Sequence, residues 1–381
     1  MKLPRYWLPA LAVMVFVTAV VVSSRPAPAQ RFETEKYAIG VDTFASGLEH
    51  PWGLAFLPDG RMLVTERPGR IRLVETDGSL SEPLEGAPST QSFGQGGMLD
   101  IALDPDFTET SRVFITFAYI ENGKAGTAVW RARLATDGTP RLVDGTMIFR
   151  MNKLSSKGQH FGSRIVFAPD KTLWVTVGER GERDRAQDPS DHAGSVLRMD
   201  RDGKAPADNP FVGRDGDDLI WSIGHRNPQG AAFNPWTKTL WTVEHGAQGG
   251  DEINTPQPGR NYGWPVIAYG REYSGGKIGE GTERPGMEQP VYYWDPSIAP
   301  SGMEFYTGDA FPEWRGNVFI GALKFQLLAR LTLDGDKITA EERMLEDLGE
   351  RIRAVKQGPD GNLYLLTDNA RGRILKISRA R

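Results

Sequence analysis

The sequence predicts an all-β protein, and more specifically a six-bladed β-propeller. One pattern recurs six times: a short apolar strand, a turn built on Pro-Asp-Gly or a relative of it, and a second strand of alternating or aromatic residues. The copies extend over almost the whole chain, and almost no helical periodicity lies between them. Hairpins repeated in this way are typical of propellers, in which each copy forms part of one blade.

The six copies begin with residues 52, 99, 163, 229, 301 and 353. In order they read WGLAFLPDGRMLVTER, LDIALDPDFTETSRVFITFAY, SRIVFAPDKTLWVTVGER, QGAAFNPWTKTLWTVEHG, SGMEFYTGDAFPEWRGNVFIGAL and RAVKQGPDGNLYLLTDNARGRILKI. The alternative is a β-sandwich or a pair of them, but a sandwich does not require the same hairpin six times. Longer stretches at residues 201–218 and 270–289 separate some copies, and we expect them to project from one face of the ring.

The first 29 residues have the pattern of a secretory signal. Two basic residues precede an apolar run, and Ala27-Pro28-Ala29 matches a signal peptidase site. An uncleaved membrane anchor is the alternative, but the run from Leu8 to Val22 is shorter than the roughly 20 residues of a spanning helix. We therefore expect a signal peptide at 1–29, a single propeller domain at 30–381, and a mature protein in the periplasm or outside the cell, without stable membrane insertion.

The composition excludes some functions. The chain carries 45 basic and 49 acidic residues, a net charge of −4, and loss of the three basic residues of the signal makes it −7. This acidic balance gives no reason to expect nucleic acid as a partner. Cysteine is absent, so the fold uses no disulfides, and any metal must be held by oxygen or imidazole. The sequence leaves the oligomeric state open.

A set of polar residues stands next to the strands of different repeats. In a propeller, such positions converge on the central channel, so distant pieces of sequence can build one pocket. One imidazole, two amides and five cations fit a small ligand that carries several carboxylates or phosphates. Each residue also has a purely structural interpretation, for example an arginine that binds carbonyls of the next blade. The set is Gln95, His160, Arg180, Arg226, Asn227, Lys324, Arg351 and Arg353.

The loop that follows the fourth repeat offers oxygen ligands for a metal. Residues 246–250 form a glycine-rich segment with exposed carbonyl groups, and Asp251 and Glu252 follow directly. Calcium accepts carbonyl and carboxylate oxygens in flexible geometry. The spacing is not that of an EF-hand, and a solvated acidic turn remains the alternative.

Taken together, the motifs resemble those of the soluble sugar dehydrogenases that depend on pyrroloquinoline quinone (PQQ). Among these, the chain resembles the bacterial aldose sugar dehydrogenases of the glucose/sorbosone dehydrogenase family. The resemblance runs in order from Gly47 to Ile377, through GQGGMLDIALDPDF, GQHFGSR, GHRNPQGAAF, EHGAQGGDEIN, NYGWP, SGMEFY and RIRAV. It implies a six-bladed propeller, bound PQQ, and calcium at the cofactor.

The resemblance also implies a role for each matching residue. His160 matches the general base, which takes the proton of the anomeric hydroxyl while hydride passes from C1 of the sugar to the quinone. Arg226 matches the cation that polarises the quinone carbonyl. Asn227 matches the residue next to that cation, which also contacts the cofactor. Further cofactor contacts are Gln95, Lys324, Arg351 and Arg353. The carbonyl groups of Gly246 and Ala247 match ligands of the cofactor's calcium, and Glu252 and Tyr262 match ligands of a second, structural calcium.

The sequence departs from the family at positions near these residues. Gln159 stands where glucose-specialised relatives have an aspartate that can hold the imidazole, so the expected stabilisation of charged His160 is weaker. Arg180 replaces a glutamine, and Ala247 replaces a proline at the calcium. His192 and His245 receive no chemical role, and His225 is expected to brace the loop that presents Arg226.

The predicted activity is oxidation of the anomeric carbon of aldoses to lactones by a calcium- and PQQ-dependent enzyme, with electrons passed to an unidentified external acceptor. Two alternatives remain. A lactonase-type propeller hydrolase would need no quinone, and a non-catalytic propeller that binds glycans or proteins would take up no cofactor. The excess of cations argues against the lactonase, since a lactonase has no multiply charged cofactor to hold.

Overall fold

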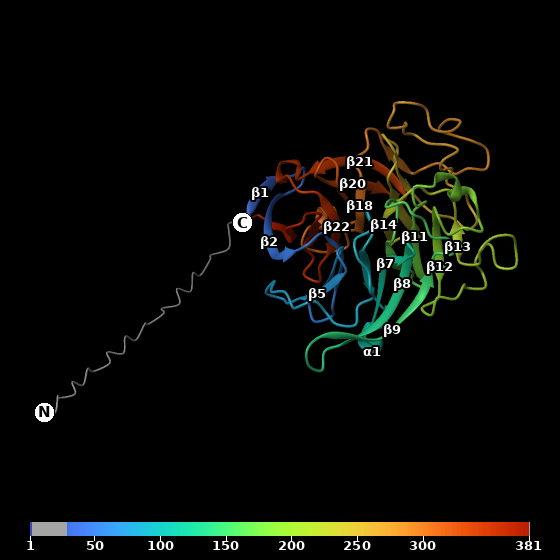
Figure 1. The fold of residues 1–381 in the computed structure, drawn as a ribbon. Coiled ribbons are helices and arrows are strands. Elements are labelled where there is room, and N and C mark those ends of the chain that lie inside the picture. Colours follow the sequence, from blue (N-terminus) through green and yellow to red (C-terminus); the bar gives the residue numbers. More distant parts are fainter. Residues whose placement is uncertain (2–28, 381) are drawn as a thin grey trace.

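The computed structural model describes Met1 and residues 29–380, which form six antiparallel sheets arranged in a ring (Figure 1). The predicted signal segment, 1–29, lies almost wholly outside the described residues. The innermost strand of each sheet packs beside the innermost strand of the next sheet, and β22 meets β3, which closes the ring. The predicted six-bladed propeller is confirmed, and the β-sandwich alternative is wrong.

The strands, in chain order, are β1 (Gln30–Glu33), β2 (Ala38–Leu48), β3 (Pro51–Phe56), β4 (Met62–Glu66), β5 (Arg70–Val74), β6 (Met98–Leu103), β7 (Arg112–Glu121), β8 (Lys124–Ala135), β9 (Arg141–Arg150), β10 (Ile165–Phe167), β11 (Leu173–Val177), β12 (Ser195–Met199), β13 (Ile220–Ser222), β14 (Pro228–Phe233), β15 (Leu240–Glu244), β16 (Asp251–Asn254), β17 (Tyr292–Trp294), β18 (Pro300–Phe305), β19 (Val318–Ala322), β20 (Leu328–Asp334), β21 (Lys337–Met344), β22 (Ile352–Gln357), β23 (Leu363–Thr367) and β24 (Gly372–Arg379). The helices are short: α1 (Phe107–Thr110) and three 3₁₀ turns, η1 (Arg183–Gln187), η2 (Pro312–Trp314) and η3 (Glu346–Leu348).

The six repeats of the sequence form the two innermost strands of the six blades. They are the antiparallel pairs β3–β4, β6–β7, β10–β11, β14–β15, β18–β19 and β22–β23. The first repeat shows why its turn contains Pro-Asp-Gly. Gly60 has a φ of +89° and its N–H donates to the carbonyl of Leu57, a backbone conformation that residues with a side chain rarely adopt.

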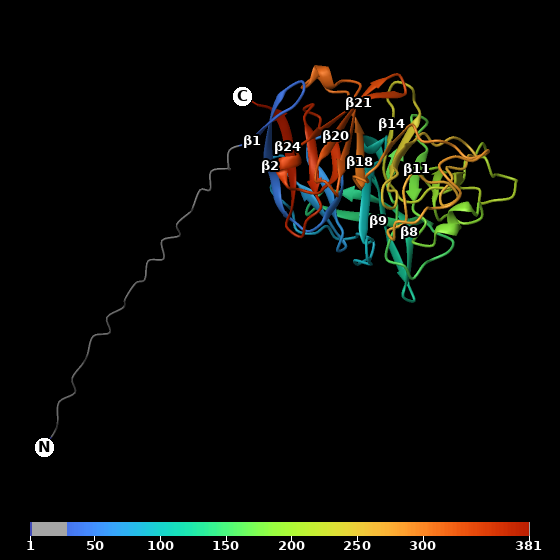
Figure 2. The ribbon, with the colours of Figure 1, turned by 90° about the horizontal axis from the view of Figure 1, so that it is seen from above.

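The two ends of the chain complete one blade together. β2, near the N-terminus, pairs in antiparallel register with β24, near the C-terminus, for example Val41 with Ile377. Figures 1 and 2 both place β2 beside the C-terminal end of the chain. This pairing joins the first and last segments of the ring by main-chain hydrogen bonds, so the closure does not depend on side chains alone.

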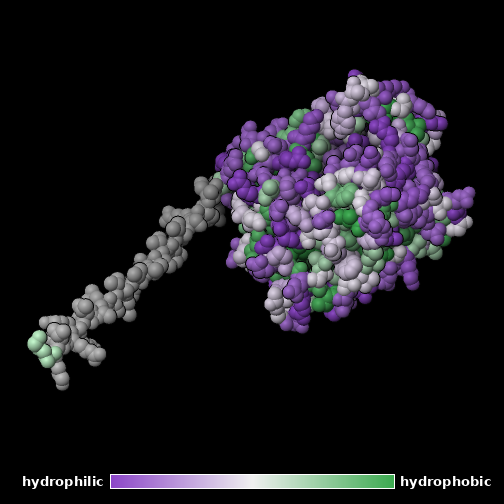
Figure 3. Space-filling model, in the orientation of Figure 1, coloured by the Kyte–Doolittle hydropathy of each residue, from purple (hydrophilic) through white to green (hydrophobic). Residues whose placement is uncertain are grey.

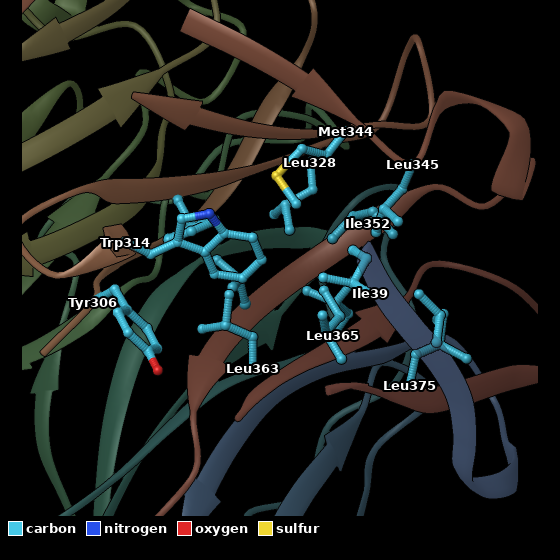
Figure 4. Packing of buried hydrophobic residues seen from close by; sticks show 14 of the residues in the cluster. Ile39, Tyr306, Trp314, Leu328, Met344, Leu345, Ile352, Leu363, Leu365 and Leu375 are labelled. Atoms are coloured by element: carbon cyan, nitrogen blue, oxygen red, sulfur yellow. The ribbon is translucent and has the colours of Figure 1, made fainter. Parts of the chain in front are cut away.

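The hydrophobic core lies between neighbouring blades. Because every sheet is covered on both faces, whole strands are buried, as in β4, β11 and β19. Figure 4 shows one such layer, in which Trp314 and Leu328 pack against Ile352, Leu363 and other residues of the closing blade. Replacing Trp314 by alanine would be expected to cost about 3–5 kcal/mol.

The outside of the ring is mainly hydrophilic on the face seen in Figure 3, and its hydrophobic side chains are scattered. None of the helices in the described part of the chain is long and apolar enough to cross a membrane. The two longest stretches noted in the sequence lie in the connections between β12 and β13 and between β16 and β17.

Candidate functional site

A cavity of about 270 Å³ lies where loops from all six blades converge on the channel. Five of the residues singled out in the sequence line it: Gln95, Asn227, Lys324, Arg351 and Arg353. The remaining lining residues are Trp52, Arg67, Leu99, Phe161, Gly162, Gln229, His245, Ala299, Leu323 and Asp368. The structure thus brings together residues that are more than 250 positions apart in the chain.

His160 stands beside this cavity and is held on two sides. Its ring is buried, and Nδ1 lies 2.6 Å from Oε1 of Glu179. Its backbone N–H donates to Oε1 of Gln95 over 2.9 Å, and its φ of +55° places it in the left-handed region. A carboxylate can only accept, so the proton of the neutral ring is on Nδ1, and Nε2 has a free lone pair.

The protonation states of this pair have a clear physical origin. Burial lowers the pKa of His160 below its ordinary value, and the hydrogen bond to Glu179 partly opposes this effect. Burial alone would raise the pKa of Glu179, but the hydrogen bond from His160 and the charge of Arg226 keep it below its ordinary value. At neutral pH the pair is therefore a carboxylate and a neutral imidazole.

Gln159 does not hold the ring of His160, which bonds to the carboxylate of Glu179. The side chain of Gln159 packs instead against Gly181, which has a φ of +72° and no side chain of its own. Of the GERGER segment, residues 178–183, the sequence pattern pointed to Arg180 and not to the preceding Glu179. The carboxylate that the family pattern led us to expect is thus supplied from another loop.

Arg180 does not line the cavity. Its side chain is fully buried, and its guanidinium donates to the carbonyl oxygens of Gln159 and Lys157 and stacks on the ring of Phe161. Burial lowers its pKa to about 9. The structural interpretation of this residue is therefore the right one: Arg180 fastens the loop that carries His160.

Arg226 and Asn227 connect His160 to the fourth blade. The guanidinium of Arg226 donates to the carbonyl oxygens of His245 and Gly246 and lies 5.1 Å from the ring centre of Trp264. The carbonyl of Arg226 accepts a hydrogen bond from the N–H of Glu179. Asn227 is buried, and its side-chain oxygen accepts from the N–H of Gly162, two residues after His160.

The opposite side of the cavity carries charged groups from the last two blades. Arg351 and Arg353 both donate to Oδ2 of Asp368, at 3.1 and 2.9 Å. Arg353 also donates to the side chain of Gln229, and His50 bonds to the other oxygen of Asp368. Burial opposes ionisation of Asp368, but the charge of Arg353 and the hydrogen bond to His50 hold the pKa of Asp368 well below its usual range. Both arginines thus face the same side of the cavity.

A second, smaller pocket adjoins the first along the loop after β15. Gly246, Ala247, Glu252 and Tyr262 line it, together with Glu244 and Arg226. Asp251 is not available there, because its two carboxylate oxygens accept hydrogen bonds from the N–H groups of Gly246, Ile298 and Ala299. The phenol of Tyr262 is also occupied, since it donates to the carbonyl of Thr255 and accepts from the N–H of Gln257.

The second pocket has an unbalanced charge. Burial, together with the charge of Glu244, raises the pKa of Glu252 to about 8. Asn254 donates to both carboxylates, and its own oxygen is buried without a hydrogen-bond partner among the described residues. Two carboxylates and an unsatisfied amide oxygen form a suitable environment for a hard cation. No cluster of three or more His, Cys, Asp or Glu residues positioned for a metal occurs in the described residues, so such a cation would also need backbone oxygens.

Glu244 joins the second pocket to Arg226. One of its oxygens bonds to Nδ1 of His225, and the other accepts from the backbone N–H of Arg226 over 2.6 Å. His225 is fully buried and stacks on Tyr262. The prediction that His225 braces the loop of Arg226 is therefore confirmed. Nε2 of His192 lies 3.0 Å from Oδ2 of Asp217, and Nε2 of His245 bonds to the carbonyl of Pro300.

Comparisons with known proteins agree with this architecture. Residues 48–376 match the family model described as Glucose / Sorbosone dehydrogenase. The chain is 46% identical over 345 residues to the aldose sugar dehydrogenase YliI of Escherichia coli K12. The matched region covers 89% of this chain and 93% of that protein. A crystal structure of a glucose dehydrogenase is 49% identical, covers 89% of this chain and 99% of that chain, and has a TM-score of 0.87. The structure of the PQQ-bound form of an aldose sugar dehydrogenase from Streptomyces coelicolor is 30% identical and has a TM-score of 0.75. The match covers 93% of this chain and 100% of that chain. The chain therefore belongs to the glucose/sorbosone dehydrogenase family of sugar oxidoreductases.

Proposed function

We propose that this protein is a PQQ- and calcium-dependent dehydrogenase that oxidises the anomeric carbon of aldoses to lactones. The observation that carries the proposal is the charge of the cavity. Its lining contains four cations, Arg67, Lys324, Arg351 and Arg353, against one carboxylate, Asp368. The pKa of His245 is lowered to about 3, chiefly by burial, so this ring is neutral.

This charge fits the cofactor. A net of three positive charges in the cavity of an acidic protein matches the three carboxylates of PQQ, and guanidinium groups bind carboxylates in a bidentate manner. Lys324, Arg351 and Arg353 would hold those carboxylates. Gln95, Asn227 and Arg226 would contact the cofactor from the side of the cavity that is nearest His160. When bound, PQQ would supply the two-electron acceptor for the hydride of the sugar.

His160 has the features required of the base. Nε2 of the neutral ring would accept the proton of the anomeric hydroxyl, and the carboxylate of Glu179 would stabilise the imidazolium that results. Removal of this proton and of the hydride on C1 leaves the C1–O1 double bond of the lactone. Gln95 fixes the backbone of His160, so the orientation of the ring does not depend on the substrate.

Two cation positions are part of the proposal. Gly246 and Ala247 would offer their carbonyl oxygens to a calcium ion next to the cofactor, where Arg226 already approaches Gly246. Glu252 would bind the second ion. Since the phenol of Tyr262 is occupied, Tyr262 would contribute its backbone carbonyl.

The first test is a reconstitution of the purified protein. Apoprotein is combined with PQQ and calcium and offered a panel of aldoses, and reduction of an artificial dye is followed. We expect dye reduction only when sugar, PQQ and calcium are all present, and its loss when calcium is chelated. Lactone hydrolysis without any quinone, or no uptake of PQQ, would contradict the proposal.

The setting of the reaction is also proposed. The reduced cofactor would pass its electrons to an external acceptor, which the sequence does not identify. On the pattern of residues 1–29, we propose that the mature chain, 30–381, is one propeller domain in the periplasm or outside the cell. Detection of the protein in a periplasmic fraction, cleaved after Ala29, is the corresponding measurement.

A further inference from the structure

We propose that Arg67 is a further binding residue of the site, and that its guanidinium binds a carboxylate presented into the cavity. Arg67 was not among the residues that the sequence pattern selected. The inference rests on the proposed function, since that function supplies the ligands that carry carboxylates. It starts from the position of Arg67 in the lining of the cavity and from the absence of a partner for its guanidinium.

The fold holds the backbone of Arg67 firmly at the cavity. Arg67 directly follows β4, its N–H donates to the carbonyl of His50, and its own carbonyl accepts from the N–H of Met98. Gly97 makes this approach possible, because a Cβ at that position would lie 2.8 Å from Cγ of Arg67. Gly97 in GQGGMLD thus has a role in the site, which is to let Arg67 pass close to the second blade.

Arg67 differs from the other arginines around the cavity because its guanidinium makes no hydrogen bond or ion pair with the described residues. Arg351 and Arg353 share Asp368, Arg226 binds two carbonyls, and Arg180 is used to fasten a loop. Across residues 29–380, no carboxylate pairs with Arg67, and its Nε is buried without a hydrogen-bond partner. A buried guanidinium N–H without an acceptor is costly, so the site is complete only when an anion fills it.

The position of Arg67 also determines what it can reach. The first blade lies between the closing blade, which carries Arg351 and Arg353, and the second blade, which carries Gln95 next to His160. A carboxylate bound to Arg67 can therefore belong to the cofactor, on the side of the other cations. It can also belong to an acidic sugar whose anomeric carbon faces His160. Both ligands present the same chemistry to the guanidinium.

The test compares wild-type protein with R67Q and R67K, and uses R371Q as the matched control. Arg371 is exposed, and it lies in the turn between β23 and β24, so R371Q removes the same charge outside the cavity. PQQ is titrated into each apoprotein in the presence of calcium and without sugar, and binding is followed by quenching of tryptophan fluorescence. KM is then measured for glucose and for glucuronate, and thermal unfolding checks that each variant is folded.

We expect R67Q to weaken one of these ligands by roughly tenfold or more, R67K by less, and R371Q by little. A higher Kd for PQQ assigns Arg67 to a cofactor carboxylate. An unchanged Kd with a raised KM for glucuronate, but not for glucose, assigns it to the carboxylate of the sugar. If wild-type protein binds PQQ and R67Q changes neither quantity, the inference is wrong and the proposed function stands. If wild-type protein does not bind PQQ, the proposed function itself fails.

Discussion

The two sides of the cavity differ in how their polar groups are hydrogen-bonded and in their net charge. On the base side, which consists of Gln95, His160 and Glu179, each group is bonded to another: Gln95 accepts from the backbone N–H of His160, and the buried ring of His160 bonds to the buried carboxylate of Glu179. On the anion side, which consists of Lys324, Arg351, Arg353 and Asp368, cations outnumber carboxylates, and two of the cations are partly or fully exposed. The first arrangement fixes one ring in one protonation state. The second leaves charge available for a ligand.

This difference separates catalysis from binding. A substitution on the base side is expected to change the rate of the chemical step and to leave cofactor binding intact. A substitution on the anion side is expected to do the reverse, because uniform binding energy does not accelerate the step. The following variants test that separation, from the largest expected effect to the smallest.

His160→Ala is expected to have the largest effect. Loss of a general base lowers kcat by about 10²- to 10⁴-fold, whereas the affinity for PQQ should stay near the wild-type value. Steady-state dye reduction and a PQQ titration measure the two quantities. Wild-type activity in this variant would remove His160 from the mechanism, and loss of PQQ binding would remove the separation of the two sides.

Glu179→Gln should lower kcat by roughly 10- to 100-fold, since a hydrogen bond to a charged group contributes about 1.5–3 kcal/mol. The amide keeps the size of the side chain but cannot stabilise the imidazolium. Gln159→Ala is the control, because the ring bonds to Glu179 and the side chain of Gln159 lies against Gly181. If Gln159→Ala reduced kcat as much as Glu179→Gln, the assignment of the carboxylate would be wrong.

Lys324→Gln removes an exposed cation of the anion side. We expect a roughly tenfold higher Kd for PQQ and an unchanged kcat at saturating cofactor, because Lys324 lines the cavity, and among the described residues its ammonium forms no hydrogen bond or ion pair with Gln95, His160 or Glu179. Equilibrium titration at two salt concentrations provides the measurement. A lower kcat with unchanged binding would show that the two sides are not separate.

Asp368→Asn should act mainly on stability. The folded-state pKa of Asp368 is depressed, so its contribution is present above the unfolded value near 3.8 and is lost as pH falls through the folded value. We expect the apoprotein variant to be less stable by about 1–3 kcal/mol at pH 7, with the difference shrinking below about pH 4. Denaturant unfolding measures this, and exposed Asp309→Asn, which pairs only with Arg315 on the surface, should change little.

The sequence predicted the fold more completely than the site. Six hairpins with matching turns are local patterns, and ring closure follows from their number. Residues such as His160 and Arg226 stand in distinctive motifs, so they could be selected directly. Glu179, Asp368 and Arg67 could not, because each is an ordinary charged residue whose importance depends on which loop faces it in space.

Gln159 shows the limit of reasoning from neighbouring positions. The residue before a histidine is its neighbour in the chain, but the left-handed backbone at His160 turns the chain between the two residues. The imidazole then meets a loop 19 residues further on. A signal for Glu179 existed in the GERGER segment, but only the packing of the second strand of that blade shows that this glutamate faces the ring.

The pH dependence of kcat/KM in wild-type protein and Glu179→Gln tests the central claim most directly. His160 must be neutral to accept a proton, so the rate falls as pH drops through its pKa, and burial places that pKa below 6.5. Since Glu179 raises the pKa of His160, the account predicts that Glu179→Gln moves the acid limb to still lower pH while lowering the plateau. An acid limb that stays in place or moves to higher pH would show that Glu179 does not hold the catalytic base.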